Sequence, residues 1–234
     1  MEKSVIIVAG GSGSRMNSTI PKQFLLLENL PVLMHTISAF INAGCFSITV
    51  VIPHQYIELW SQLCTQYAFT INHKVIAGGN TRFESVKNGL NSIETVEGTV
   101  AIHDGARPLV SLNLIKTAFK LAEETGSAVP CCDLSDSIRF IDGPTSKSVP
   151  RNLYKSVQTP QCFKLSLIKS AYLSTDTDDF NDDASLLEAQ GVEVTLFDGE
   201  AENIKITRPI DMMIAEAIIK QRSVSSPVSS SRIP

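Results

Sequence analysis

The sequence lacks the features that would direct a chain to a membrane or to nucleic acid. Its apolar runs are short, and the first one breaks at Gly10, so we expect neither a signal peptide nor a membrane span. With 20 basic and 24 acidic side chains the net charge is −4. No general positive field therefore attracts nucleic acid, and any anion site must be a local cluster of cations.

Cysteine and histidine are also sparse and scattered. The five cysteines form no Cys-x-x-Cys pair, and the four histidines are not grouped with them. This pattern disfavours a zinc site. Free thiols are typical of a reducing compartment, so we expect a cytoplasmic protein.

What the chain does have is enough apolar residues for one large domain. Hydrophobic residues make up 43% of 234 positions, which suits a single α/β domain at residues 1–222. Residues 223–234 are dominated by Ser, Pro and Val and are expected to be a disordered tail.

Apolar β-branched runs alternate with helical patterns along this domain. Apolar residues at helical spacing predict helices at residues 32–43 and over segments containing residues 83–93, 114–121 and 213–220. The expected strands are residues 5–8, 47–52, 73–76, 99–103, 128–131, 193–197 and 203–206. Apolar strands separated by helices imply a mostly parallel, Rossmann-like sheet covered on both faces, that is, an α/β three-layer sandwich.

One long segment breaks this alternation. Residues 133–161 show no clean helical pattern and are punctuated by Gly143, Pro144, Pro150 and Pro160. Because a structureless loop of that length is uncommon inside a compact domain, we expect a protruding β-arm.

The most informative motif follows the first expected strand. Gly10, Gly11 and Gly13 form a loop whose backbone N–H groups can approach phosphate oxygens, and Arg15 and Lys22 follow it. The Walker pattern is absent because Ser14 and Arg15, not Lys-Ser/Thr, follow Gly13. The dinucleotide fingerprint is absent as well, since Met16 stands where it requires Gly or Ala. These departures disfavour an NAD-dependent reductase. A glycine-rich turn that merely carries charge remains the simpler reading of this loop alone.

Two further polar loops follow other expected strands, and they meet the first loop at the carboxyl edge of a parallel sheet. Residues 78–82 with Ser85 open a helix and form a second place for nucleotide contacts. Residues 103–108, His-Asp-Gly-Ala-Arg-Pro, follow a third strand. The convergence of three such loops predicts a nucleotide site.

Six ordered blocks together resemble the 2-C-methyl-D-erythritol 4-phosphate cytidylyltransferase family over about residues 3–222. They are Ala9-Gly10-Gly11-x-Gly13-x-Arg15-Met16, Pro21-Lys22-Gln23, Gly78-Gly79-x-x-Arg82-x-x-Ser85-Val86, His103-Asp104-Gly105-Ala106-Arg107-Pro108, Thr159-Pro160-Gln161 and Asn203-Ile204-Lys205-Ile206-Thr207-Arg208-Pro209. The ribitol-5-phosphate cytidylyltransferases are similar at the nucleotide end and at Thr-Pro-Gln. The form of residues 105–108, residues 182–185 and Arg208 look more like the methylerythritol family.

The resemblance implies an enzyme that transfers a cytidylyl group from CTP to 2-C-methyl-D-erythritol 4-phosphate in non-mevalonate isoprenoid precursor biosynthesis. It implies that Arg15 and Lys22 stabilise the pentacoordinate phosphorus and that Arg151 and Lys205 position the acceptor. Arg107, Ser137 and Thr159 are implied near the acceptor phosphate or hydroxyls, although the stretch before Ser137 is longer than usual and Thr is commoner there. The implied contacts to CTP are Ala9, Gly10, Gly11, Gly79, Asn80, Ser85, Asp104 and Gly105.

Elementary chemistry agrees with these roles, because phosphoryl-type transfer relies on positioning and charge stabilisation. We expect Mg²⁺ to bind mainly through the CTP phosphates, and we name no protein ligand for it. The arm and the resemblance imply a homodimer. A ribitol-5-phosphate cytidylyltransferase and a non-catalytic nucleotide-binding sensor remain the alternatives.

Overall fold

The computed structural model describes residues 2–11, 16, 20–175 and 177–225. Its centre is an eight-stranded sheet in the order β10-β7-β11-β6-β1-β4-β5, with β12 beside β7. The bounds are β1 Lys3–Val8, β4 Ser47–Ile52, β5 Lys74–Ala77, β6 Thr99–Asp104, β7 Ser127–Asp133, β10 Lys155–Val157, β11 Gln161–Lys164 and β12 Leu196–Asp198. The central pairs β6–β1, β1–β4 and β4–β5 are parallel, whereas β10 and β11 run antiparallel to their neighbours. The expected α/β fold is confirmed, with a mixed sheet.

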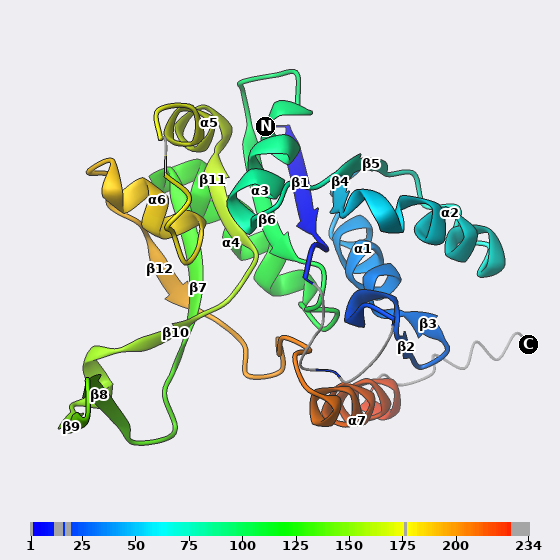
Figure 1. Cartoon of the computed structure of the whole chain (residues 1–234). Coiled ribbons are helices and arrows are strands. Elements are labelled where there is room, and N and C mark those ends of the chain that lie inside the picture. The colour runs from blue at the N-terminus through cyan, green and yellow to red at the C-terminus, as the bar shows by residue number, and fades with distance from the viewer. Residues whose placement is uncertain (1, 12–15, 17–19, 176, 226–234) are drawn as a thin grey trace, which may run out of the picture.

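Helices cover both faces of this sheet and make three layers (Figure 1). One face packs against α1 (Val32–Asn42), α2 (Ile57–Gln66) and α4 (Leu112–Thr125). The other packs against α3 (Arg82–Asn91), α5 (Leu165–Leu173) and α6 (Asp183–Ala189). Side chains of β1 alternate between the two cores, because Val5 and Ile7 join the first and Ile6 the second.

Local chemistry fixes where several helices begin and end. The Thr81 hydroxyl accepts a hydrogen bond from the Glu84 N–H at the start of α3. Ser111 caps α4 in the same way, and Gly126, at φ 98°, ends that helix. A third core packs α7 (Pro209–Ser225) against the loops after β1 and β6. Apolar residues of these loops, Met16, Ala106 and Leu109, therefore lie next to α7.

The arm is a β-hairpin that stands away from the body of the molecule (Figure 1). It consists of β8 (Ile138–Asp142) and β9 (Thr145–Val149), which pair only with each other in the described chain. The short helix η4 (Arg151–Leu153) and β10 lead back to the sheet. The expected β-arm is thus present, although its hairpin covers fewer residues than the expected range 133–161.

Three expectations about elements are wrong. Residues 203–206 form no strand; side-chain and backbone contacts described below hold them instead. The strand expected at residues 193–197 is β12, which is shorter and begins three residues later. The α7 helix runs to Ser225, three residues into the expected tail, and residues 226–234 lie outside the described part of the chain. Helices α2, α5 and α6 and strand β11 were not anticipated.

A close backbone approach joins α3 to the sheet at Gly89. A Cβ built at this position would lie 2.7 Å from Cγ2 of Ile6 on β1. Because α3 carries one wall of the pocket described below, this contact also sets the depth of that wall.

We expect Gly89→Val to lower the free energy of unfolding by roughly 1–3 kcal/mol, the usual cost of overpacking a core contact. Urea unfolding measures it. Asn91→Val, at an exposed site on the same helix, is the control and should change stability by no more than about 0.5 kcal/mol. Equal effects of the two variants would contradict the close packing.

Candidate active site

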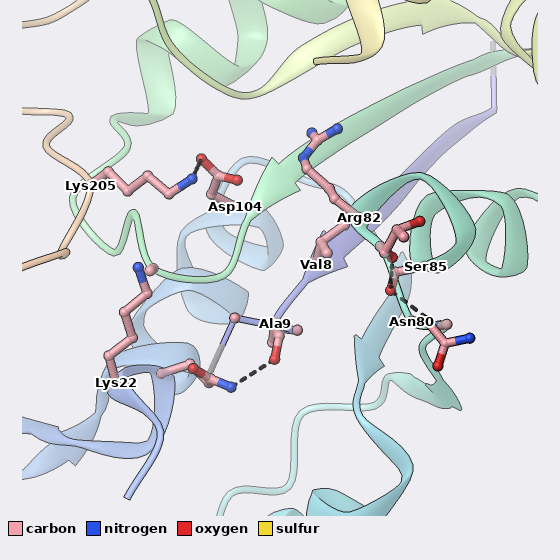
Figure 2. Close-up of a pocket in the computed structure, with 14 residues that line it drawn as sticks. Val8, Ala9, Lys22, Asn80, Arg82, Ser85, Asp104 and Lys205 are labelled. Carbon is pink, nitrogen blue, oxygen red and sulfur yellow. Dashed lines mark hydrogen bonds and ion pairs between the residues drawn. The ribbon is translucent and has the colours of Figure 1, made fainter. Parts of the chain in front are cut away.

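The polar loops converge on one pocket at the carboxyl end of the central strands, as Figure 2 shows. The pocket has a volume of about 270 Å³. Its lining comes from the ends of β1 and β6, the β5–α3 turn, η2 (Lys22–Phe24) and the segment before α7. The lining residues are Val8, Ala9, Gly10, Gly11, Lys22, Gln23, Gly79, Asn80, Thr81, Arg82, Ser85, Asp104, Ala106 and Lys205.

The first loop is held against the floor of the pocket by η2. Gln23 Nε2 donates to the Ala9 carbonyl at 2.7 Å. Phe24 packs against Tyr56 and Trp60, with ring centroids 5.9 and 6.0 Å apart, and so anchors the short helix. Lys22 is therefore carried by a fixed turn; its side chain is largely buried and passes beside Gly11.

The second wall is the tight β5–α3 turn. Ser85 Oγ accepts from Gly79 N at 3.1 Å and donates to the Thr81 carbonyl at 2.8 Å. Only glycine fits at position 79, because a Cβ there would lie 2.2 Å from Cβ of Glu84. The Ser85 hydroxyl thus shapes the turn that presents backbone groups to the pocket.

Asp104, at the end of β6, is the electrostatic centre of the site. Its Oδ2 lies 3.0 Å from Lys205 Nζ and 3.1 Å from Arg107 Nε. Burial alone would raise the pKa of Asp104, but the charges of Lys205, Arg107 and Arg82 outweigh it and lower the pKa. The carboxylate is therefore ionised and pins two cations beside the pocket.

Lys205 comes from an irregular segment that buried polar contacts hold in place. Asn203 Nδ2 donates to the Thr159 carbonyl at 2.8 Å, and Arg107 Nη1 donates to the Asn203 carbonyl at 2.8 Å. Ile206 N donates to the Ala106 carbonyl at 2.8 Å. These contacts replace the strand expected at residues 203–206 and still bring Lys205 to Asp104.

Behind Asp104, the buried side chain of His103 fixes the turn at residues 104–107. Burial lowers the pKa of His103 to about 4, so its ring is neutral at pH 7. Nε2 lies 3.1 Å from the Arg107 carbonyl, which can only accept, so this nitrogen carries the proton. Nδ1 then accepts from the Thr159 hydroxyl at 3.1 Å, and the same hydroxyl oxygen accepts from Asp104 N at 3.1 Å.

With this geometry in view, the comparisons with known proteins decide the family. A sequence profile described as 2-C-methyl-D-erythritol 4-phosphate cytidylyltransferase matches residues 4–221. The chain belongs to this family. Curated members from Bacteroides thetaiotaomicron and Phocaeicola vulgatus are 46% and 47% identical over 220 residues, covering 94% of this chain and 100% of each relative.

Solved structures of the family agree with the fold. A structure of 2-C-methyl-D-erythritol 4-phosphate cytidylyltransferase from Thermus thermophilus matches with a TM-score of 0.79 and 31% identity. That match covers 94% of this chain and 100% of the other.

The structure gathers most of the site residues that the sequence predicts. Nine line the pocket: Ala9, Gly10, Gly11, Lys22, Gly79, Asn80, Ser85, Asp104 and Lys205. Arg107 and Thr159 lie directly behind Asp104. Gly105 packs beneath the loop, where its N–H donates to the Val8 carbonyl at 2.8 Å.

Two further predicted residues do not line this pocket. Ser137 and Arg151 are exposed on the arm, and Arg151 donates a hydrogen bond to the Ser135 carbonyl there. Arg15 lies outside the described residues, so its role stays a prediction. Arg82 and Gln23 line the pocket without a predicted role, although each lies inside a sequence block that was already singled out.

The neutral His103 predicts a pH dependence of stability. As pH falls from about 6.5 toward 4, the unfolded chain protonates this histidine while the folded chain does not, so folding stability is lost on acidification. At about 1.4 kcal/mol per pKa unit, the loss due to His103 amounts to about 3 kcal/mol.

We therefore expect His103→Gln to have a shallower fall in unfolding free energy over this range than the unsubstituted protein, measured by urea unfolding at several pH values. His54→Gln, which removes an exposed imidazole, tests whether the loss of any histidine makes this fall in unfolding free energy shallower. A slope for His103→Gln that equals the unsubstituted slope would contradict burial of the neutral ring.

Proposed function

We propose that this protein transfers the cytidylyl group of CTP to 2-C-methyl-D-erythritol 4-phosphate, giving 4-diphosphocytidyl-2-C-methyl-D-erythritol and pyrophosphate in isoprenoid precursor biosynthesis. The observation that best supports this proposal is the pocket itself. Its lining combines the backbones of Gly10, Gly11 and Gly79 with the cations Lys22, Lys205 and Arg82, in a chain whose net charge is negative. Its relatives, 46% and 47% identical over their full length, are named for this activity.

The reaction requires mainly that two anions, the acceptor phosphate and CTP, be brought together. An oxygen of the acceptor phosphate attacks the α-phosphorus of CTP, a new P–O bond forms, and the bond to the β-phosphate oxygen breaks so that pyrophosphate leaves with the electron pair. The attacking oxygen is already anionic, so no strong general base is required. Lys22 on its fixed turn is suited to stabilise charge on the phosphorus, and Lys205 to hold the acceptor phosphate.

Mg²⁺ fits this site as a companion of the nucleotide. Asp104 is the carboxylate that lines the described pocket, and it is already paired with Lys205 and Arg107. In the described part of the chain, no cluster of three His, Cys, Asp or Glu residues is arranged to hold a metal ion. The phosphates would supply most ligands to the ion, and its charge would offset part of the triphosphate charge.

We also propose a cellular compartment for this reaction. In the described chain, no helix is both long and apolar enough to cross a membrane. All five cysteines are free thiols. Both CTP and free thiols suit the cytoplasm, where we place the reaction.

Pyrophosphate release with CTP, Mg²⁺ and a panel of sugar-alcohol phosphates tests the assignment. We expect kcat/KM to be highest with methylerythritol phosphate as acceptor and with CTP as donor over ATP, GTP and UTP. Comparable or better kcat/KM with ribitol 5-phosphate would favour the ribitol enzyme. CTP binding without turnover of any acceptor would favour a sensor.

Replacing Lys22 by Ala should lower kcat by roughly 10²–10³-fold, the usual loss for a donor directed at transition-state charge. The same loss is expected for Arg15→Ala. Lys120→Ala, at an exposed site on α4, is the control and should leave kcat unchanged. A Lys22→Ala enzyme with normal kcat and only a raised KM for CTP would assign Lys22 to ground-state binding instead.

We also propose that the arm joins two subunits and that Arg151 completes the partner's acceptor site. The hairpin exposes Phe140 and Ile141, at 52% and 66%, and η4 exposes Leu153 at 73%. Apolar side chains held this far from the body of the molecule suit a two-fold clasp between arms.

Mixing Lys22→Ala with Arg151→Ala subunits, after dissociation and reassociation, tests this proposal. Random pairing makes about half of the dimers mixed, and each mixed dimer then holds one intact site, so about a quarter of the original activity should return. If Arg151 acts within its own subunit, no activity returns; tagged subunits must show that exchange took place.

A further inference from the structure

A buried carboxylate outside the pocket is bonded to a cation that lines it. Asp183, the first residue of α6, has no solvent exposure. Its Oδ1 accepts from Arg82 Nη1 at 3.0 Å, and its Oδ2 accepts from Arg82 Nη2 at 2.5 Å. The Tyr172 hydroxyl donates to Oδ1 at 2.6 Å. Both carboxylate oxygens are therefore bonded, and the pair is bidentate.

The carboxylate is itself anchored to the sheet. Gln161, at the start of β11, accepts hydrogen bonds at Oε1 from the backbone N–H groups of Asp183 and Ala184, at 3.1 and 3.0 Å. Gln161 Nε2 donates to Asp182 Oδ2 at 2.8 Å. Asp182 in turn caps α6 through Ser185 in a capping box. The position of Asp183 thus follows the sheet rather than a surface loop.

Arg82 faces the pocket from the other end of this pair. It is the first residue of α3, and about a third of its side chain is exposed. Figure 2 shows its side chain extending from the start of α3, on the side of Asp104 opposite Lys205. The planar guanidinium has five N–H donors in a fixed fork, and Asp183 engages two of them.

The pair has a geometric consequence. A buried ion pair adds little net stability compared with apolar residues of similar size, because both charges lose water. It does restrict the guanidinium to one plane and one depth. The long Arg82 side chain, at the start of α3, is thereby held in one orientation toward the pocket.

We propose that Asp183 is a positioning residue that holds Arg82 in place to donate hydrogen bonds to an oxygen of bound CTP. The inference rests on the proposed function, because it assigns this wall of the pocket to the nucleotide. The wall otherwise consists of Gly79, Asn80 and Thr81, whereas Lys205 lies on the other side of Asp104 (Figure 2). Tyr172 and Gln161 act through Asp183.

The test compares KM for CTP with KM for the acceptor in matched variants. Arg82→Lys keeps the charge and loses the fork, and Asp183→Asn removes the carboxylate. Each should raise KM for CTP by roughly tenfold or more, the usual effect of losing a hydrogen bond to a charged group. KM for the acceptor should stay within about twofold if Arg82 serves only the nucleotide.

A double variant keeps the test independent of folding. Arg82→Gln with Asp183→Asn replaces the ion pair by two neutral amides and leaves no buried charge unpaired. If Asp183 acts through Arg82, the double variant should raise KM for CTP no more than Arg82→Gln alone. Tyr172→Phe should give a smaller rise, and Tyr67→Phe, at the end of α2, should give none.

Inorganic triphosphate as a competitive inhibitor identifies which oxygen is involved. A weaker inhibition of Arg82→Lys points to a phosphate oxygen; unchanged inhibition points to the nucleoside.

Calorimetric titration of CTP without acceptor keeps this inference apart from the proposed function. Weaker CTP binding in Arg82→Lys and Asp183→Asn supports the inference even if transfer to methylerythritol phosphate is not observed. Folded variants that bind CTP as the unsubstituted protein does, and differ only in melting temperature, would overturn it and leave Asp183 a purely structural residue.

Discussion

The carboxylate of Asp104 is the interaction on which the arrangement of the site depends. It ends the strand that pairs with β1, so it lies beside the glycine loop, and it is bonded to Lys205 and Arg107 at about the same distance. Without this carboxylate, Lys205 and Arg107 would repel each other and turn toward solvent. With it, Lys205 is held at the pocket and Arg107 directly behind Asp104. Lys22, Arg82 and Lys205 thus gather at one pocket in a chain of net charge −4.

Buried polar side chains hold the segments around this carboxylate in place. The neutral His103 and the Thr159 hydroxyl hold the Asp104 backbone, and Asn203 ties the segment of Lys205 to Thr159. Asp183 holds Arg82 on the opposite wall. Hydrogen-bonded networks of this kind, in a low-dielectric interior, restrict the movement of the groups they join. Rigidity suits a reaction in which orientation and charge carry most of the rate acceleration.

The order of loops and cations could be predicted from the sequence because short-range patterns encode it. Apolar runs located the central strands, and their polar ends located the pocket. Contacts between distant residues have no such signature. Arg82 and Asp183 are 101 positions apart, so nothing local marks them as a pair. Residues 203–206 resemble a strand by composition, but Asn203 and Ile206 face buried partners, which an extended β-branched run does not reveal. The antiparallel strand β11 was missed because it is short and directly follows Pro160.

The steady-state kinetics of Asp104→Asn test this account most directly. CTP and methylerythritol phosphate are varied separately. Removing a negative charge from a polyphosphate site should strengthen CTP binding if net charge alone governs it. If Asp104 instead positions Lys205 and Arg107, kcat/KM should fall by roughly 10²-fold although the pocket becomes more positive. An Asp104→Asn enzyme with unchanged or higher kcat/KM would contradict the account.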